Sequence, residues 1–234
     1  MPKERQLYSY SRETKTLERT VRKRLEKHFG RPEWREPLAP IDVLVSTILS
    51  QNTKDMNRDM AFYRLKHRFV SWEAVRDADE DEVIEAIRPA GLGNQKGPRI
   101  QDVLRQISEQ RGSLELDFLK ELPFEEAHAW LMQFKGVGRK TAAIVLLFAL
   151  GVPDFPVDTH IYRVTERLAL RPAGLSLEQA HDYLAGLIPP EEYYTSHLNL
   201  IRLGRELCHA RKPDCLHCPL NNICAYYLNV VSKA

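Results

Sequence analysis

Apolar residues recur along most of the chain at spacings of three and four residues, the pattern of a helix that buries one face. The first such segment follows Pro40, a residue suited to the first turn of a helix, and contains Ile41, Leu44, Val45, Ile48 and Leu49. Strand-like alternation of apolar and polar residues is absent from the sequence, so the predicted fold class is all-α. We expect the same helical pattern to give helices over 79–87, 100–107 and 124–134.

Several helix starts are marked by capping residues. Asp79 with Glu82, and Ser176 with Gln179, have the spacing of a capping box, in which two side chains satisfy backbone groups at the start of a helix. Asp158 is a good N-cap for the segment that follows it. We expect these later helices to run over about 158–170, 176–187 and 191–208.

The segment 141–150 is apolar on all sides, as expected of a helix that is packed on every face. It ends at Gly151, and Pro153 follows, an arrangement typical of a helix C-terminus. We therefore predict that this helix lies in the core of the fold. Residues 151–156 are the place where the chain is expected to cross between two domains.

The composition is that of a globular protein, since 43 % of the 234 residues are hydrophobic, 28 % are charged and the formal net charge is only +2. A disordered or collagen-like chain is excluded. The longest apolar run, 142–150, is far shorter than the roughly 20 residues needed to cross a bilayer. Residues 1–15 lack the apolar centre of a secretory signal. We expect no membrane segment and a cytoplasmic location.

All four cysteines lie between 208 and 224, in the spacing C-x6-C-x2-C-x5-C. In a reducing compartment such a cluster indicates a metal site rather than disulfides. Thiolate ligands alone permit either zinc or an iron-sulfur cluster, and the single CxxC differs from the paired CxxC of many structural zinc sites. The loop after the first cysteine is basic and suits contact with phosphates, through Arg211 and Lys212. The candidate ligands are Cys208, Cys215, Cys218 and Cys224.

Two predicted helices are joined by a short glycine-containing turn, 135–138. Its backbone amides and the positive start of the second helix suit an anion such as a DNA phosphate, and the adjacent Arg139 and Lys140 strengthen that interpretation. A hairpin between two helices with no ligand has the same pattern.

Lys140 and Asp158 each have two interpretations. Lys140 lies at the start of the apolar helix, where a positive helix end and an apolar wall both favour the neutral amine that can form a Schiff base. Local sequence alone favours contact with a phosphate or simple exposure. For Asp158 a helix cap is the structural interpretation, and a carboxylate that stabilises a cationic sugar is compatible with it.

The combination LMQFKGVGRKTAAIVLLFALGVPDFPVDTHIYRV, followed by the cysteine spacing, resembles endonuclease III and its helix-hairpin-helix DNA glycosylase relatives. The segments ILSQNTKDMN and AGLGNQK extend the resemblance over nearly the whole chain. It implies a six-helix barrel domain over 32–152 beside an iron-sulfur cluster domain formed by 1–31 and 153–234. It also implies a monomer that binds DNA in the cleft between them.

The same resemblance assigns roles to individual residues. Lys140 is the implied Schiff-base nucleophile and Asp158 the essential carboxylate, and the four cysteines hold a 4Fe-4S cluster with a structural or redox-sensing role. Leu92 is the side chain implied to wedge into the duplex beside the extruded base, which must leave the stack before its glycosidic carbon can be reached. The implied DNA contacts are Gln51, Asn52, Leu92, Asn94, Gly136, Val137, Gly138, Arg139, Arg211 and Lys212.

Two departures from the family pattern affect these assignments. Gln51 and Asn52 stand where bacterial endonuclease III has Ala-Gln, so that an ungapped comparison places Asn52 at the position that fills the gap left by the flipped nucleotide. Either amide suits this role. Phe134 and Lys135 replace the usual Leu-Pro before the hairpin turn, which adds a positive charge and loosens the entry to the turn.

The resemblance implies a bifunctional DNA glycosylase and abasic-site lyase in base excision repair, acting on oxidised pyrimidines such as thymine glycol through a lysine Schiff base and β-elimination. One alternative is a monofunctional glycosylase for thymine or uracil opposite guanine, whose relatives typically have Ser or Tyr in place of Lys140. A non-catalytic DNA-binding iron-sulfur protein is a second alternative, and a ferredoxin-type electron carrier is a third.

Overall fold

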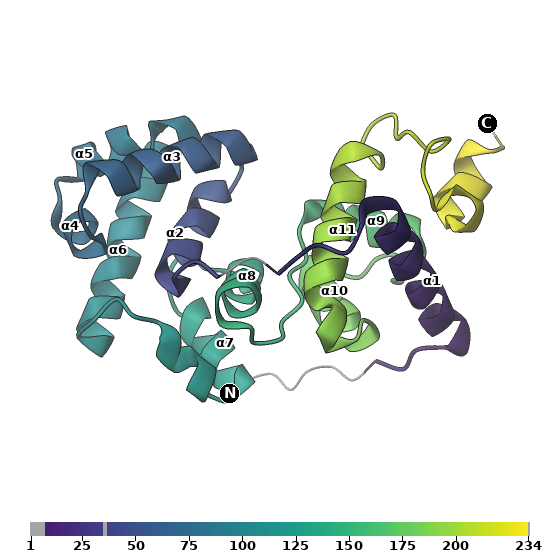
Figure 1. The fold of residues 1–234 in the computed structure, drawn as a ribbon, viewed down its shortest axis with the longest axis horizontal. Helices are drawn as coiled ribbons and strands as arrows, with labels where there is room; N and C mark the ends of the chain where they lie inside the picture. The colour runs from purple at the N-terminus through teal and green to yellow at the C-terminus, as the bar shows by residue number, and fades with distance from the viewer. Residues whose placement is uncertain (1–7, 35–36, 234) are drawn as a thin grey trace. The chain divides into compact units, whose positions relative to one another are not determined.

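The computed structural model describes residues 8–34 and 37–233, and within them every regular element is helical. This confirms the all-α prediction. The chain divides into two compact units, one formed by 36–152 and the other by 1–35 together with 153–234 (Figure 1).

The unit 36–152 is built around α8 (Arg139–Leu150). Eight of its twelve residues are buried, and α2 (Pro40–Ser50) and α7 (Phe124–Met132) pack against it. This confirms the predicted core helix, and Gly151 ends it in the left-handed conformation with φ +67°. The other α-helices described in this unit are α3 (Asp55–Arg68), α4 (Trp72–Asp77), α5 (Glu80–Ala86) and α6 (Gly93–Arg111), and two short 3-10 helices lie at Arg88–Ala90 and Asp117–Glu121.

The second unit joins segments from both ends of the chain. Its long helix α11 (Tyr193–Glu206) packs against α9 (Thr159–Arg167) and against α1 (Arg12–Phe29), as Figure 1 shows. Helix α10 (Leu177–Leu187) begins with the predicted capping box of Ser176 and Gln179, which is fully formed. In the parts of the chain that the structure describes, no helix has both the length and the hydrophobicity to span a bilayer.

Some helix ends differ from the predicted ones, each for a local reason. Asp79 caps α5 by accepting a hydrogen bond from the Asp81 amide, but Glu82 forms an ion pair with Arg68 at 2.7 Å rather than completing a capping box. Helix α9 ends at Arg167, three residues early, because Ala169 adopts a left-handed φ of +56°.

Candidate functional site

The turn between α7 and α8 is anchored by Val137, whose side chain is buried in the core of its unit. Its amide donates to the Phe134 carbonyl oxygen at 3.0 Å, so this N–H is used inside the turn rather than directed outward. The amides of Gly136 and Gly138 have no acceptor within the described residues. Of the three amides expected to face an anion, two are therefore available.

Lys140 lies in the first turn of α8, two residues after Gly138. Its side chain is half-buried, and its Nζ forms no hydrogen bond or ion pair with any residue that the structure describes. The next residue, Thr141, is already buried in the core. A primary amine thus stands at the edge of the hairpin turn, held by a helix of which most residues are buried.

The short segment between α2 and α3 carries Gln51 and Asn52. Gln51 is the C-cap of α2, and its Nε2 donates to the Gly136 carbonyl oxygen at 2.9 Å. Asn52 is exposed and has a φ of +53°, a left-handed conformation that asparagine tolerates better than most residues. The hairpin turn and this segment are therefore in direct contact.

Leu92 occupies a strained position before α6. It is the N-cap residue of this helix with a φ of +53°, and its large apolar side chain is 48 % exposed. Leucine held in the left-handed region costs on the order of 1–2 kcal/mol, and such strain is concentrated at functional positions. Asn94 is exposed in the first turn of the same helix. An exposed, rigidly presented leucine fits the wedge role that the sequence implies for it.

Lys96 connects the Leu92 turn to the Asn52 segment and was not identified from the sequence. Its side chain is only 1 % exposed, and its Nζ donates to Thr53 Oγ1 at 2.6 Å, to the Leu49 carbonyl at 2.8 Å and to the Ala90 carbonyl at 2.9 Å. All three donors of the ammonium group are used. Burial, with the nearby Arg99 charge, lowers the pKa of Lys96.

A signal for this burial is present in the sequence, because Lys96 is in phase with the buried positions Ile100, Val103 and Ile107 of α6. Thr53 Oγ1 also donates to the Ala90 carbonyl at 2.5 Å. The structure thus brings three segments of one unit together through side-chain hydrogen bonds. They are the Asn52 segment, the Leu92 turn and the hairpin turn.

Asp158 belongs to the other unit, where it is the predicted N-cap of α9. Its Oδ1 accepts a hydrogen bond from the Ile161 amide at 2.7 Å, and only 8 % of the residue is exposed. The preceding backbone is also fixed, since the Phe155 carbonyl lies 3.2 Å from His181 Nδ1 and the Pro156 carbonyl 2.9 Å from His197 Nδ1. The carboxylate therefore has little freedom to move.

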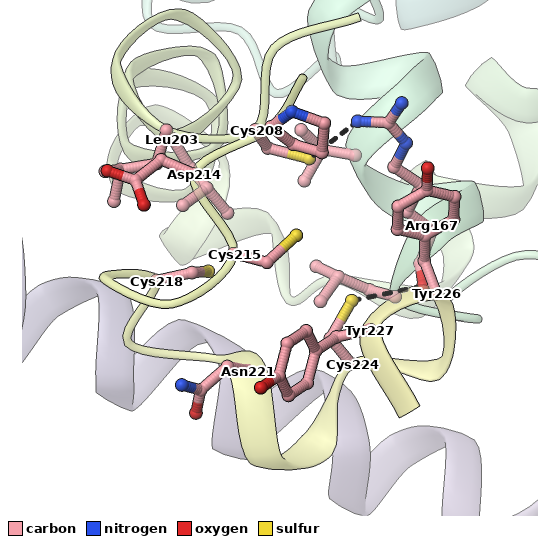
Figure 2. A pocket seen from close by; sticks show the side chains of 14 residues that line it. Arg167, Leu203, Cys208, Asp214, Cys215, Cys218, Asn221, Cys224, Tyr226 and Tyr227 are labelled. Carbon is pink, nitrogen blue, oxygen red and sulfur yellow. Dashed lines mark hydrogen bonds between the residues drawn. The ribbon is translucent and has the colours of Figure 1, made fainter. Parts of the chain in front are cut away.

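The four cysteines line a single pocket at the C-terminal end of α9, together with apolar side chains such as Val164 and Leu203 (Figure 2). Arg167, the last residue of α9, donates to Cys208 Sγ at 3.4 Å, and its carbonyl accepts from Cys224 Sγ at 3.4 Å. Burial raises the pKa of the Cys218 thiol to about 11 and also raises the pKa of Cys215 and Cys224.

This donor set fits an iron-sulfur cluster. All its ligands are thiols, the walls of the pocket are apolar, and an arginine N–H donates to one sulfur, which is the kind of surrounding that tunes such clusters. Among residues 8–34 and 37–233, no three His, Cys, Asp or Glu side chains converge closely enough to hold a single metal ion.

The basic loop after Cys208 is held from inside its own unit. Arg167 Nη1 donates to the His209 carbonyl at 2.7 Å, and its Nη2 donates to the Ala210 carbonyl at 3.0 Å. Arg211 and Lys212 follow, both exposed, and Lys212 has a left-handed φ of +49°. The contact of Arg211 and Lys212 with DNA phosphates stays a prediction.

Comparison with known proteins agrees with these features. Residues 45–190 match the model of the HhH-GPD superfamily of base excision DNA repair proteins, and residues 208–224 match the iron-sulfur binding domain of endonuclease III. Endonuclease III of Sulfolobus acidocaldarius is 35 % identical over 192 residues, which cover 81 % of this chain and 83 % of the relative.

Two solved structures are similar over nearly the whole chain, each at 28 % sequence identity. A non-covalent endonuclease III-DNA complex has a TM-score of 0.81 and covers 94 % of this chain and 99 % of its own. A trapped endonuclease III-DNA covalent intermediate has a TM-score of 0.80, with 92 % and 97 % covered.

Proposed function

Because the chain belongs to the endonuclease III family of the HhH-GPD superfamily, a family of DNA glycosylases and abasic-site lyases, we propose that Lys140 is its nucleophile and oxidised pyrimidines its substrates. The enzyme acts in base excision repair, binds DNA and has a 4Fe-4S cluster as cofactor. The observation that carries the proposal is the unpaired, half-buried amine of Lys140 beside the hairpin turn.

In the proposed reaction the neutral Lys140 amine attacks C1′ of the damaged nucleotide. The C1′–N bond to the base breaks, the base leaves with the bonding electron pair and takes up a proton, and the lysine nitrogen loses a proton. Opening of the sugar ring then gives a protonated C1′=N Schiff base. Loss of a C2′ proton and breakage of the C3′–O bond complete β-elimination, and water hydrolyses the imine to free Lys140.

Asp158 is proposed to supply the carboxylate of this reaction. A buried carboxylate fixed by the Ile161 amide keeps one direction in space, so it can stabilise positive charge on the sugar without reorganising first. Its second oxygen is available to accept or return a proton, since the helix cap uses Oδ1.

The remaining sequence assignments are proposed as the DNA and cluster contacts. The Gly136 and Gly138 amides bind a phosphate, Leu92 enters the stack, and Arg139, Arg211 and Lys212 neutralise backbone charge. Cys208, Cys215, Cys218 and Cys224 would hold the cluster, which would fix the shape of the basic loop and supply a centre that can exchange one electron. We infer that the protein acts as a monomer on chromosomal DNA in the cytoplasm.

Borohydride trapping tests the proposal directly, because it reduces the Schiff base to a stable covalent bond. The duplexes carry one thymine glycol, one abasic site or no damage, and the variants are Lys140→Ala and Lys135→Ala. Lys135 is an exposed lysine at the start of the hairpin turn and is the matched control. We expect an adduct on the thymine glycol duplex that Lys140→Ala abolishes and Lys135→Ala retains.

Each other outcome has a defined meaning. Adduct formation by Lys140→Ala would overturn the assignment of the nucleophile. Base release without any adduct would favour the monofunctional mismatch glycosylase, and an adduct on the abasic duplex alone would leave a lyase with another base substrate. Binding to plain duplex should weaken steeply with salt, whereas an electron carrier would show no specific duplex binding.

A further inference from the structure

Gln51 uses both ends of its carboxamide inside the protein. Its Nε2 donates to the Gly136 carbonyl oxygen at 2.9 Å, and its Oε1 accepts from Arg99 Nη1 at 2.8 Å. Only one orientation of the amide satisfies both neighbours, because a carbonyl can only accept and a guanidinium can only donate. The amide is therefore fixed by its partners.

These two contacts join segments that are far apart in the sequence. Gln51 and Gly136 are separated by 85 residues, and Gln51 and Arg99 by 48. Gln51 caps α2, Arg99 lies within α6 and Gly136 forms the hairpin turn, so the carboxamide is a junction of three elements in one unit.

The junction is packed closely around the hairpin. Gly136 has a φ of +85°, and a Cβ at this position would overlap the side chain of Arg99, so the guanidinium stem lies directly against the turn. Because the Gly136 carbonyl is held by Gln51, the orientation of the peptide that links Gly136 to Val137 is fixed as well. The same stretch of backbone sets the direction of the neighbouring Gly138 amide.

Asn52 has a different surrounding. It is exposed, and its side chain makes no hydrogen bond to any residue within the described ranges. Its backbone position is set from both sides, by Gln51 before it and by Thr53, which is bonded to Ala90 and Lys96, after it. Its free amide is therefore presented on a rigid support.

We infer that Gln51 is a positioning residue, which couples the phosphate-facing hairpin turn to the Asn52 segment, and that of these two neighbouring amides only that of Asn52 is presented to the DNA. The inference rests on the proposed function for its DNA partner. Losing Gln51 should weaken every duplex complex to the same degree, because the hairpin contacts phosphates and not bases. Losing Asn52 should change how the enzyme responds to the base that faces the lesion.

The test measures dissociation constants by fluorescence anisotropy, without requiring any chemistry at Lys140. The duplexes carry tetrahydrofuran, a stable analogue of an abasic site, opposite A, G, C or T, and one duplex is undamaged. The variants are Gln51→Met and Asn52→Ala. Gln110→Met is the matched control, because Gln110, near the end of α6, also loses two amide hydrogen bonds, one donated to Gln133 and one accepted from it.

We expect Gln51→Met to raise all five dissociation constants by a common factor of about five to ten. This factor corresponds to the loss of one or two hydrogen bonds that support the hairpin turn. Asn52→Ala should make the dissociation constants of the four tetrahydrofuran duplexes, which differ in the opposite base, more similar to one another. Gln110→Met should have the same dissociation constants as the wild type. The two roles would be reversed if the dependence of the dissociation constant on the opposite base changed in Gln51→Met and stayed as in the wild type in Asn52→Ala. Dissociation constants in Gln51→Met within twofold of the wild type would overturn the coupling.

Amide hydrogen exchange keeps the inference testable if Gln51→Met is less stable. Exchange in a peptide covering 134–141 should accelerate while that of 100–111 stays at the wild-type rate, whereas uniform acceleration would indicate general destabilisation and contradict a specific link. The proposed function is tested separately in the same data. A wild-type enzyme that binds the tetrahydrofuran duplexes no better than the undamaged one would contradict lesion recognition and leave the uniform effect of Gln51→Met intact.

Discussion

The carboxylate of Asp158 accepts a hydrogen bond from the Ile161 amide, with 2.7 Å between Oδ1 and the nitrogen. One side chain thus starts α9 and is also the proposed catalytic carboxylate. The two roles make different demands, because a cap needs only an oxygen acceptor whereas the reaction needs a negative charge.

The two roles can be separated by substitution. Asp158→Asn keeps a good capping residue, so its free energy of unfolding should stay within about 0.5 kcal/mol of the wild type, whereas Asp158→Ala should lose ~1 kcal/mol. Both should release the base at least about 100-fold more slowly, because neither has a carboxylate. Urea unfolding and single-turnover base release provide the two measurements. A normal rate in Asp158→Asn would restrict the residue to capping.

Lys96 is expected to be a structural lysine with a large effect on stability. Lys96→Met fills a similar volume but leaves the Leu49 carbonyl without its buried donor, so the free energy of unfolding should fall by ~2 kcal/mol. Lys135→Met, at an exposed lysine of the same unit, should change it by less than about 0.5 kcal/mol. Equal unfolding free energies of the two variants in urea would show that the Lys96 ammonium group makes no net contribution to stability.

The two glycines of the hairpin turn should respond differently to alanine. Gly136 has a φ of +85° and no space beside Arg99, so Gly136→Ala should lower the free energy of unfolding by ~2 kcal/mol. Gly138 has an extended φ of −91° with open space around the position of a Cβ, so Gly138→Ala should remain within about 0.5 kcal/mol. Thermal or urea unfolding of both variants provides the measurement. Similar losses of unfolding free energy in the two variants would contradict this account of the turn.

The raised pKa of Tyr10 predicts that the protein becomes less stable at alkaline pH. Burial, reinforced by Tyr183, raises the pKa of Tyr10 well above its ordinary value near 10, and its hydroxyl donates to the Tyr183 carbonyl at 2.8 Å. A raised pKa in the folded state gives stability that is fully present below pH 10 and is lost as the pH rises above it, because the unfolded chain releases its proton first. Tyr10→Phe should flatten the decline of the unfolding free energy between about pH 10 and 11. An unchanged slope would contradict the assignment.

Helices and their caps were largely predictable from the sequence because they depend on neighbouring residues. The all-apolar segment 141–150 became the buried α8, and Ser176 with Gln179 formed the expected box. Asp158 capped its helix for the same local reason. Patterns over three to eight residues contain this information.

Contacts between distant segments were not predictable in this way. Lys96 reaches acceptors 47 and 43 residues away, and its type alone suggests an exposed side chain. The bond between Gln51 and Gly136 depends on how α2 packs against α8, which no local pattern encodes.

The pairing of α1 with α11 has a consequence for the synthesis of the protein. Residues 36–152 are contiguous, so they can fold soon after they leave the ribosome, as domains generally do during translation. Helix α1 is made before residues 36–152, yet its partner, residues 193–206, emerges only after them. The apolar face of α1, with Val21 and Leu25, therefore has no packing partner until the rest of the unit has been made. The cysteine segment follows α11, so the cluster can be assembled only after α11 has been made.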